Sequence, residues 1–213
     1  LAANEALVLF FDTSAAQPLP EATFVWAVTK TDVHWARSSV GSKALIDSVA
    51  ALRCGLDQAA WDRTEGNTNC RRLLGVPDPV MQLPFDLVRS HELYRALFGS
   101  VEALIRDKHL LIVPSGALSV LPFQVLVTNR PALAIPADAT GYAEAAWLAR
   151  RHALTVLPSV ASLKALRQFA KASQAKEAFV GFGNPLLVGP NGNDKRAWDR
   201  QSCSKAAAER AQV

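Results

Sequence analysis

The sequence is poor in the residues that build metal sites and disulfide frameworks. Its 213 residues include only four histidines and three cysteines, Cys54, Cys70 and Cys203. No C-x-x-C pair or zinc-type spacing occurs, so no metal and no structural zinc are expected. An odd number of scattered cysteines predicts reduced thiols, although a Cys54–Cys70 disulfide stays open because spacing does not give distance.

Long apolar runs are absent as well. A membrane span needs about 18 or more apolar residues, whereas the runs at 6–11 and 110–114 are only strand-sized. No membrane partner is therefore expected. The N-terminus has no basic segment followed by a long apolar one, so no signal peptide is predicted and a cytoplasmic location is expected. The chain begins with Leu1, and we expect it to be part of a longer protein.

Neither the charge nor the glycines predict nucleotide or nucleic-acid binding. The 23 basic and 19 acidic residues give a net charge of +4 without a clustered basic run, so no nucleic-acid partner is expected. The glycine-rich phosphate-binding motifs are missing, and no cofactor is expected. Gly181-Phe182-Gly183 is followed by Asn-Pro, which favours a strand end turning into a loop.

The first third of the chain predicts a β-rich opening and one helix. Three segments rich in β-branched, aromatic or other apolar residues predict a strand and its hairpin partners: 6–11, 23–29 and 33–37. Apolar residues then recur every three or four positions over 42–56, which predicts a helix with Ser42 as N-cap and Gly55 near its end. The polar segment 62–69 predicts a solvated loop.

Beyond residue 84, helical patterns alternate with short apolar segments. Two helices are expected from residue 86 onward with a break near Gly99, and a further helix should begin after Ser159. The expected strands are 109–113, 153–157 and 178–181. This order predicts an α/β fold with a mostly parallel sheet flanked by helices, preceded by an N-terminal antiparallel β-hairpin region.

No pair of nucleophile and base is visible in the sequence. The four histidines lie at element boundaries or in the hairpin and are interpreted as satisfied polar residues: His34, His91, His109 and His152. Arg71 and Arg72 could lower the thiol pKa of Cys70, but no base lies nearby in the sequence. The predicted set of catalytic, cofactor-binding and metal-ligating residues is therefore empty.

Several segments resemble one known family. They are 92–99 (Glu-Leu-Tyr-Arg-Ala-Leu-Phe-Gly), 108–127, 146–159, 162–167 and Gly-Phe-Gly-Asn-Pro at 181–185, together with the hairpin opening at 5–8. In this order they resemble the CHAT domain, a caspase-like domain commonly found downstream of tetratricopeptide repeats in bacterial proteins. The resemblance implies that 1–187 is the N-terminal portion of a caspase-like domain and that 188–213 is a linker-like tail. It leaves open that the chain contains an incomplete half of the domain. Where the family often has an acidic residue before the glycine, this chain has Ser115, which we expect to cap or turn the chain.

The resemblance also implies a catalytic pair that this sequence lacks. The family places a His followed by Gly, and then a strand-end Cys, after the Gly-Phe-Gly-Asn-Pro segment, whereas no histidine here is followed by glycine. The expected dyad lies downstream. Three readings stay open: part of a cysteine endopeptidase acting on a protein or peptide, a non-catalytic signalling or protein-interaction module, and a processed subunit. The implied partners are the C-terminal half of the same domain and an N-terminal tetratricopeptide-repeat region. If that half were missing, the strand near 178–182 would leave an unpaired edge.

Overall fold

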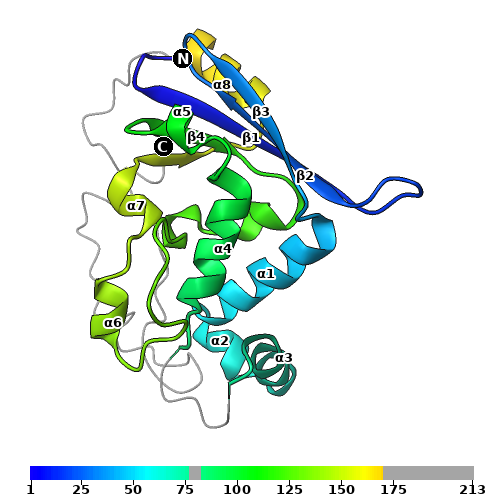
Figure 1. The fold of residues 1–213 in the computed structure, drawn as a ribbon, viewed down its shortest axis with the longest axis vertical. Coiled ribbons are helices and arrows are strands. Elements are labelled where there is room, and N and C mark those ends of the chain that lie inside the picture. Colours follow the sequence, from blue (N-terminus) through cyan, green and yellow to red (C-terminus); the bar gives the residue numbers. More distant parts are fainter. Residues whose placement is uncertain (77–82, 170–213) are drawn as a thin grey trace, which may run out of the picture. The chain divides into compact units, whose positions relative to one another are not determined.

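The computed structural model describes residues 1–76 and 83–169 (Figure 1). Five strands form one open sheet in the order β3-β2-β1-β4-β5. Their bounds are β1 Glu5–Thr13, β2 Ala22–Val28, β3 Val33–Ser38, β4 His109–Val113 and β5 Leu154–Val156. Strands β1, β4 and β5 pair in parallel, whereas β1–β2 and β2–β3 pair antiparallel. The predicted α/β fold, with a parallel core and an antiparallel hairpin region, is confirmed.

Eight α-helices and two short 3-10 helices accompany the sheet in the described residues. The α-helices are α1 Ser42–Cys54, α2 Gln58–Trp61, α3 Thr64–Leu74, α4 Leu87–Phe98, α5 Glu102–Ile105, α6 Ala139–Ala143, α7 Leu148–Arg151 and α8 Val160–Phe169. The 3-10 helices are η1 Gly116–Val120 and η2 Phe123–Val125. The predicted break near Gly99 is confirmed, because α4 ends at Phe98 and α5 begins at Glu102.

One face of the sheet forms the main core. Side chains alternate between the two faces of a strand, so Ala6, Val8 and Phe10 of β1 point to the same side and are buried together. Helices α1 and α4 cover this side with apolar residues at helical spacing: Leu45, Val49 and Leu52 from α1, and Leu93, Leu97 and Phe98 from α4. The ring of Phe10 meets that of Phe98 edge-on, with 5.4 Å between centroids.

Helix α8 covers part of the opposite face (Figure 1). Leu163 of α8 packs against Leu7, Leu111 and other residues of this second, smaller cluster. Arg167 forms an ion pair with Glu5 at the start of β1, and Glu5 is only 7% exposed. The backbone N–H of Ser162 donates to Oγ of Ser159 at 3.1 Å, which confirms the predicted helix start after Ser159. Helix α8 is thus fixed to β1 by apolar contact and by charge.

Two local predictions are wrong. Segment 62–69 is not a loop, because most of it belongs to α3. Its polar residues form the solvent side of an amphipathic helix. The buried residue of this helix, Cys70, lies just beyond the segment and packs with Trp61 in a small separate cluster. Ser42 is not the N-cap of α1 either. Gly41 holds that position, and the Ser42 hydroxyl binds Asp12 instead.

The C-terminal predictions have no structural counterpart in the described residues. The strand expected at 178–181, its unpaired edge, the Gly-Phe-Gly-Asn-Pro segment and the boundary near residue 187 all lie outside them. The predicted strand at 153–157 does fall within them and is confirmed as β5.

Candidate functional site

The carboxyl ends of β1 and β4 lie side by side at one edge of the sheet. The parallel register pairs Leu9 with Val113, so the residues that follow these two leave the sheet together. In open α/β sheets, ligands bind in the crevice outside the carboxyl ends of the strands. Asp12 near the end of β1 and Ser115 just after β4 occupy this edge. We therefore take it as the candidate functional site.

Asp12 accepts hydrogen bonds on both carboxylate oxygens. Ser115 Oγ donates to Oδ1 at 2.5 Å, and Ser42 Oγ donates to Oδ2 at 2.6 Å. The backbone N–H of Asp12 donates in turn to Ser115 Oγ at 3.1 Å. Asp12, Ser42 and Ser115 are called the Asp12 cluster below. The cluster joins the end of β1, the turn after β4 and the first residue of α1.

Gly116 allows this turn to approach the carboxylate. Its φ of +49° lies in the left-handed region, where a side chain is disfavoured. A Cβ at this position would also lie 2.7 Å from Asp12 Oδ1, closer than real Cβ contacts come. The Pro114-Ser115-Gly116 turn therefore has a serine that binds Asp12 and a glycine that leaves room for it. The expectation that Ser115 turns the chain is confirmed, although its hydroxyl binds Asp12 and does not cap η1.

The electrostatics of the cluster favour an ionised carboxylate. Burial raises the pKa of Asp12, but the hydrogen bonds from Ser115, Ser42 and the backbone lower it by more, and the net pKa lies below the usual 3.8. Each serine donates its single hydroxyl proton to this carboxylate. Among the described residues no serine hydroxyl is hydrogen-bonded to a histidine. The Asp12 cluster can hold the sheet edge in place, and it is not arranged as a nucleophile and its base.

Three of the four histidines join elements by hydrogen bonds. His91 Nδ1 lies 3.0 Å from the Val127 carbonyl oxygen, His109 Nε2 lies 2.8 Å from Thr155 Oγ1, and His152 Nδ1 lies 2.9 Å from the Lys108 carbonyl oxygen. These contacts confirm their interpretation as satisfied polar residues. His34 lies on the exposed edge strand β3.

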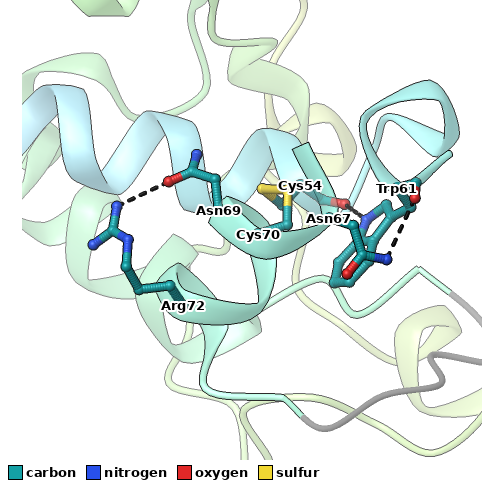
Figure 2. Close-up of a disulfide and its surroundings, with 6 residues drawn as sticks. All are labelled: Cys54, Trp61, Asn67, Asn69, Cys70 and Arg72. Atoms are coloured by element: carbon teal, nitrogen blue, oxygen red, sulfur yellow. Dashed lines mark hydrogen bonds between the residues drawn. A yellow bond between two sulfur atoms is a disulfide. The ribbon is translucent and has the colours of Figure 1, made fainter. Parts of the chain in front are cut away.

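Cys54 and Cys70 form a disulfide between α1 and α3 (Figure 2). The prediction of reduced thiols is therefore wrong for these two residues. The helical conformation of 64–74 turns Cys70 inward, and its Cα lies 5.5 Å from that of Cys54, a proximity that sequence spacing does not reveal. Neither sulfur is a free nucleophile in this form. Cys203 lies outside the described residues.

The described ranges 1–76 and 83–169 contain no group of three or more His, Cys, Asp or Glu side chains able to hold a metal ion. None of the helices described there combines the length and the apolar character needed to cross a bilayer. The sequence did not identify Asp12 as a site residue, because an aspartate at a strand end is also common in turns. Only the parallel pairing of β1 with β4 brings Asp12 next to Ser115.

Comparison with known families assigns part of the chain to a family model. A family model described as CHAT domain matches residues 88–213, which is more than half of the chain. In the described residues the matched segment begins in α4 and includes β4, the Pro114-Ser115-Gly116 turn, β5 and α8. A comparison with curated proteins gives no match.

Proposed function

Because this chain belongs to the CHAT family of caspase-like peptidase domains, we propose that it forms the N-terminal part of a cysteine endopeptidase whose catalytic dyad follows in the parent protein. The observation that carries the proposal is the family match over residues 88–213, which include β4 and β5 of the parallel β1–β4–β5 core. None of the four histidines in the sequence is followed by the glycine that the family motif has. The catalytic histidine and cysteine are therefore assigned to residues downstream of this chain.

In the proposed reaction the downstream cysteine thiolate attacks the scissile carbonyl of a protein or peptide. The downstream histidine takes the thiol proton and later delivers it to the leaving amine, while backbone N–H groups stabilise the oxyanion. The residues of this chain have a positioning role. The Asp12 cluster ties the ends of β1 and β4 to α1, which keeps the carboxyl edge of the sheet rigid beside the strands that would carry the dyad.

The proposed partners follow from this division of the domain. The C-terminal half would continue the sheet beyond β5, which has β4 as its neighbour in the described sheet. An N-terminal tetratricopeptide-repeat region would present the substrate or the activating signal. A cytoplasmic location and processing within the basic, glycine-containing tail belong to the same proposal.

A non-catalytic protein-interaction module is the second candidate. The observation that favours it is the edge strand β3, where Val33 and Trp35 are 69% and 60% exposed. Exposed aromatic residues on a sheet edge are typical of surfaces that bind another polypeptide.

Labelling with a cysteine-directed probe tests the proposal. The full-length parent and the 213-residue chain are treated side by side, and the labelled peptide is identified by mass spectrometry. We expect one labelled cysteine in the parent, downstream of residue 213, and loss of that label when the histidine of the preceding His-Gly is replaced. Absence of any selective label in the parent would favour the interaction module.

A further inference from the structure

A cavity of about 360 Å³ lies directly beside the disulfide. It opens between α1, α2, α3 and η1, and both Cys54 and Cys70 line it. Its walls are largely apolar, with Val49 from α1, Ala60 from α2 and Ala117 from η1. The cysteines themselves are only 5% and 2% exposed. The cavity is therefore the route by which a small molecule could reach the two sulfurs.

Charged residues line the same cavity. They are Arg53, Asp57 and Arg63. Arg53 is held in place because its Nη1 donates to the Val120 carbonyl oxygen at 2.8 Å. Arg63 is exposed, directly before the first turn of α3. Two cationic groups and one anionic group thus surround an apolar space that ends at a disulfide.

The cavity continues along the first turn of α3. A neighbouring cavity of about 520 Å³ shares Arg63, Gly66 and Asn69 with it. Arg72 fixes the shared Asn69, since its Nη2 donates to Asn69 Oδ1 at 2.9 Å (Figure 2). No side chain caps the N-terminus of α3, so its first N–H groups add positive potential beside Arg63, and Glu65 in the same turn offsets part of it. The groove as a whole carries both signs of charge, and an anionic group of a ligand is favoured next to Arg63.

We propose that this groove binds a small anionic thiol of the glutathione class and that the Cys54–Cys70 disulfide exchanges with it. Such a thiol has two carboxylates and one ammonium group, which complement Arg53, Arg63 and Asp57. Disulfides in the cytoplasm are usually transient and redox-sensing. Exchange with a cellular thiol therefore accounts for a disulfide in a chain whose sequence predicts a cytoplasmic location.

The exchange needs two thiol molecules. The thiolate of the first attacks one protein sulfur, the bond between the two cysteine sulfurs breaks, and its electron pair leaves on the other cysteine as a thiolate. The second thiolate attacks the resulting mixed disulfide and releases the remaining cysteine. Two electrons pass to the protein, the two protons of the thiols end on Cys54 and Cys70, and the product is the oxidised thiol dimer.

Reduction would loosen the attachment of α3. Its other contacts with neighbouring helices include Asn67 Nδ2, which donates to the Trp61 carbonyl oxygen at 3.3 Å, and the Leu73 carbonyl oxygen, which accepts from Arg89 at 3.2 Å. Trp61 Nε1 still donates to the Cys54 carbonyl oxygen at 2.7 Å, which anchors α2 to α1 without the disulfide. Thiol exchange thus acts on α3 and leaves the sheet and its main core intact.

Redox titration of the folded 213-residue chain tests the proposal. The chain is incubated without denaturant in buffers of graded reduced-to-oxidised glutathione ratio, quenched with acid, and analysed by intact mass and peptide mapping. We expect reversible conversion between disulfide and dithiol, with a glutathione adduct on Cys54 or Cys70. In Arg63→Gln and Arg53→Gln, opening by glutathione should be slower by roughly two- to fivefold each, as for an exposed ion pair.

The controls separate docking from simple reactivity. Opening by uncharged 2-mercaptoethanol should be the same in the wild type and in both variants. Arg106→Gln, an exposed position outside the groove, should leave the glutathione rate unchanged. The proposal is overturned if the disulfide opens only in denaturant, if the chain stays reduced in oxidised glutathione, or if the arginine variants slow both thiols equally.

Discussion

Ser115 donates its hydroxyl proton to the carboxylate of Asp12, 103 residues earlier in the chain. The bond joins the carboxyl ends of two neighbouring parallel strands. Ser42, at the start of α1, donates a hydrogen bond to the second carboxylate oxygen. The turn after β4 is thus fixed by a single ionised side chain, and its stability should depend on that charge.

Replacing Asp12 by asparagine should destabilise the fold. Both serine hydroxyls would lose a charged acceptor, and hydrogen bonds to charged groups contribute about 1.5–3 kcal/mol each. Because Asp12 is partly exposed and water can replace part of this, we expect Asp12→Asn to lower the free energy of unfolding by about 1–3 kcal/mol. Urea denaturation of the wild type and the variant measures this difference in the free energy of unfolding. Asp32→Asn, in the exposed β2–β3 turn, is the matched control and should change stability by less than about 0.5 kcal/mol.

Stability should fall in acid through the same residue. The pKa of Asp12 in the folded chain lies below its usual 3.8, so the folded state binds this proton less readily than the unfolded state. The contribution of Asp12 is therefore present above the unfolded pKa and is lost as the pH falls through the folded pKa. Unfolding free energies measured between about pH 5 and pH 2 should decrease less steeply in Asp12→Asn than in the wild type. Parallel curves would contradict this.

Gly116→Ala should be more harmful than Gly75→Ala. Both glycines have positive φ, +49° and +65°, so both substitutions incur the cost of a left-handed residue, about 1–2 kcal/mol. A Cβ at Gly75 would meet nothing within 4 Å, whereas one at Gly116 would collide with the Asp12 carboxylate. We expect an additional loss of roughly 1 kcal/mol or more at Gly116. This difference between the two variants should shrink when Asp12 is replaced by serine, as a double-mutant cycle measures.

Loss of the Cys54–Cys70 disulfide should destabilise the chain. The two cysteines are separated by 16 residues. A disulfide that closes a loop of this length lowers the entropy of the unfolded chain, which raises the free energy of unfolding by about 3 kcal/mol. The Cys54→Ser/Cys70→Ser double variant should therefore unfold at lower urea concentration than the oxidised chain. Dithiothreitol should bring the wild type close to the double variant and leave the double variant unchanged. Equal stability of the oxidised and reduced wild type would contradict the prediction.

The sheet could be predicted because its pattern is local. The apolar strands β1 and β4, the hairpin partners of β1 and the Ser159 helix start each follow from neighbouring residues. The failures concern residues whose role depends on distant partners. Segment 64–74 is polar by composition, and its helix is supported by Cys54 and Trp61. Ser42 matches an N-cap in the sequence but binds Asp12 in the structure.

The Asp12 cluster could not be predicted for the same reason. Asp12, Ser42 and Ser115 meet only because β1 pairs in parallel with β4 and α1 starts beside them. The family resemblance located the Pro114-Ser115-Gly116 turn within a known pattern and identified Ser115 as a departure from it. It did not identify the residue that Ser115 contacts.

The most direct test of the proposed function is activity of the parent protein after Cys54, Cys70 and Cys203 have all been replaced by serine. We expect this variant still to cleave a peptide library and still to label at one cysteine downstream of residue 213, because the nucleophile is assigned there. Replacing that downstream cysteine alone should abolish both signals. If cleavage is lost in the triple variant while the folded fraction by circular dichroism matches that of the wild type, the nucleophile does not lie downstream of residue 213.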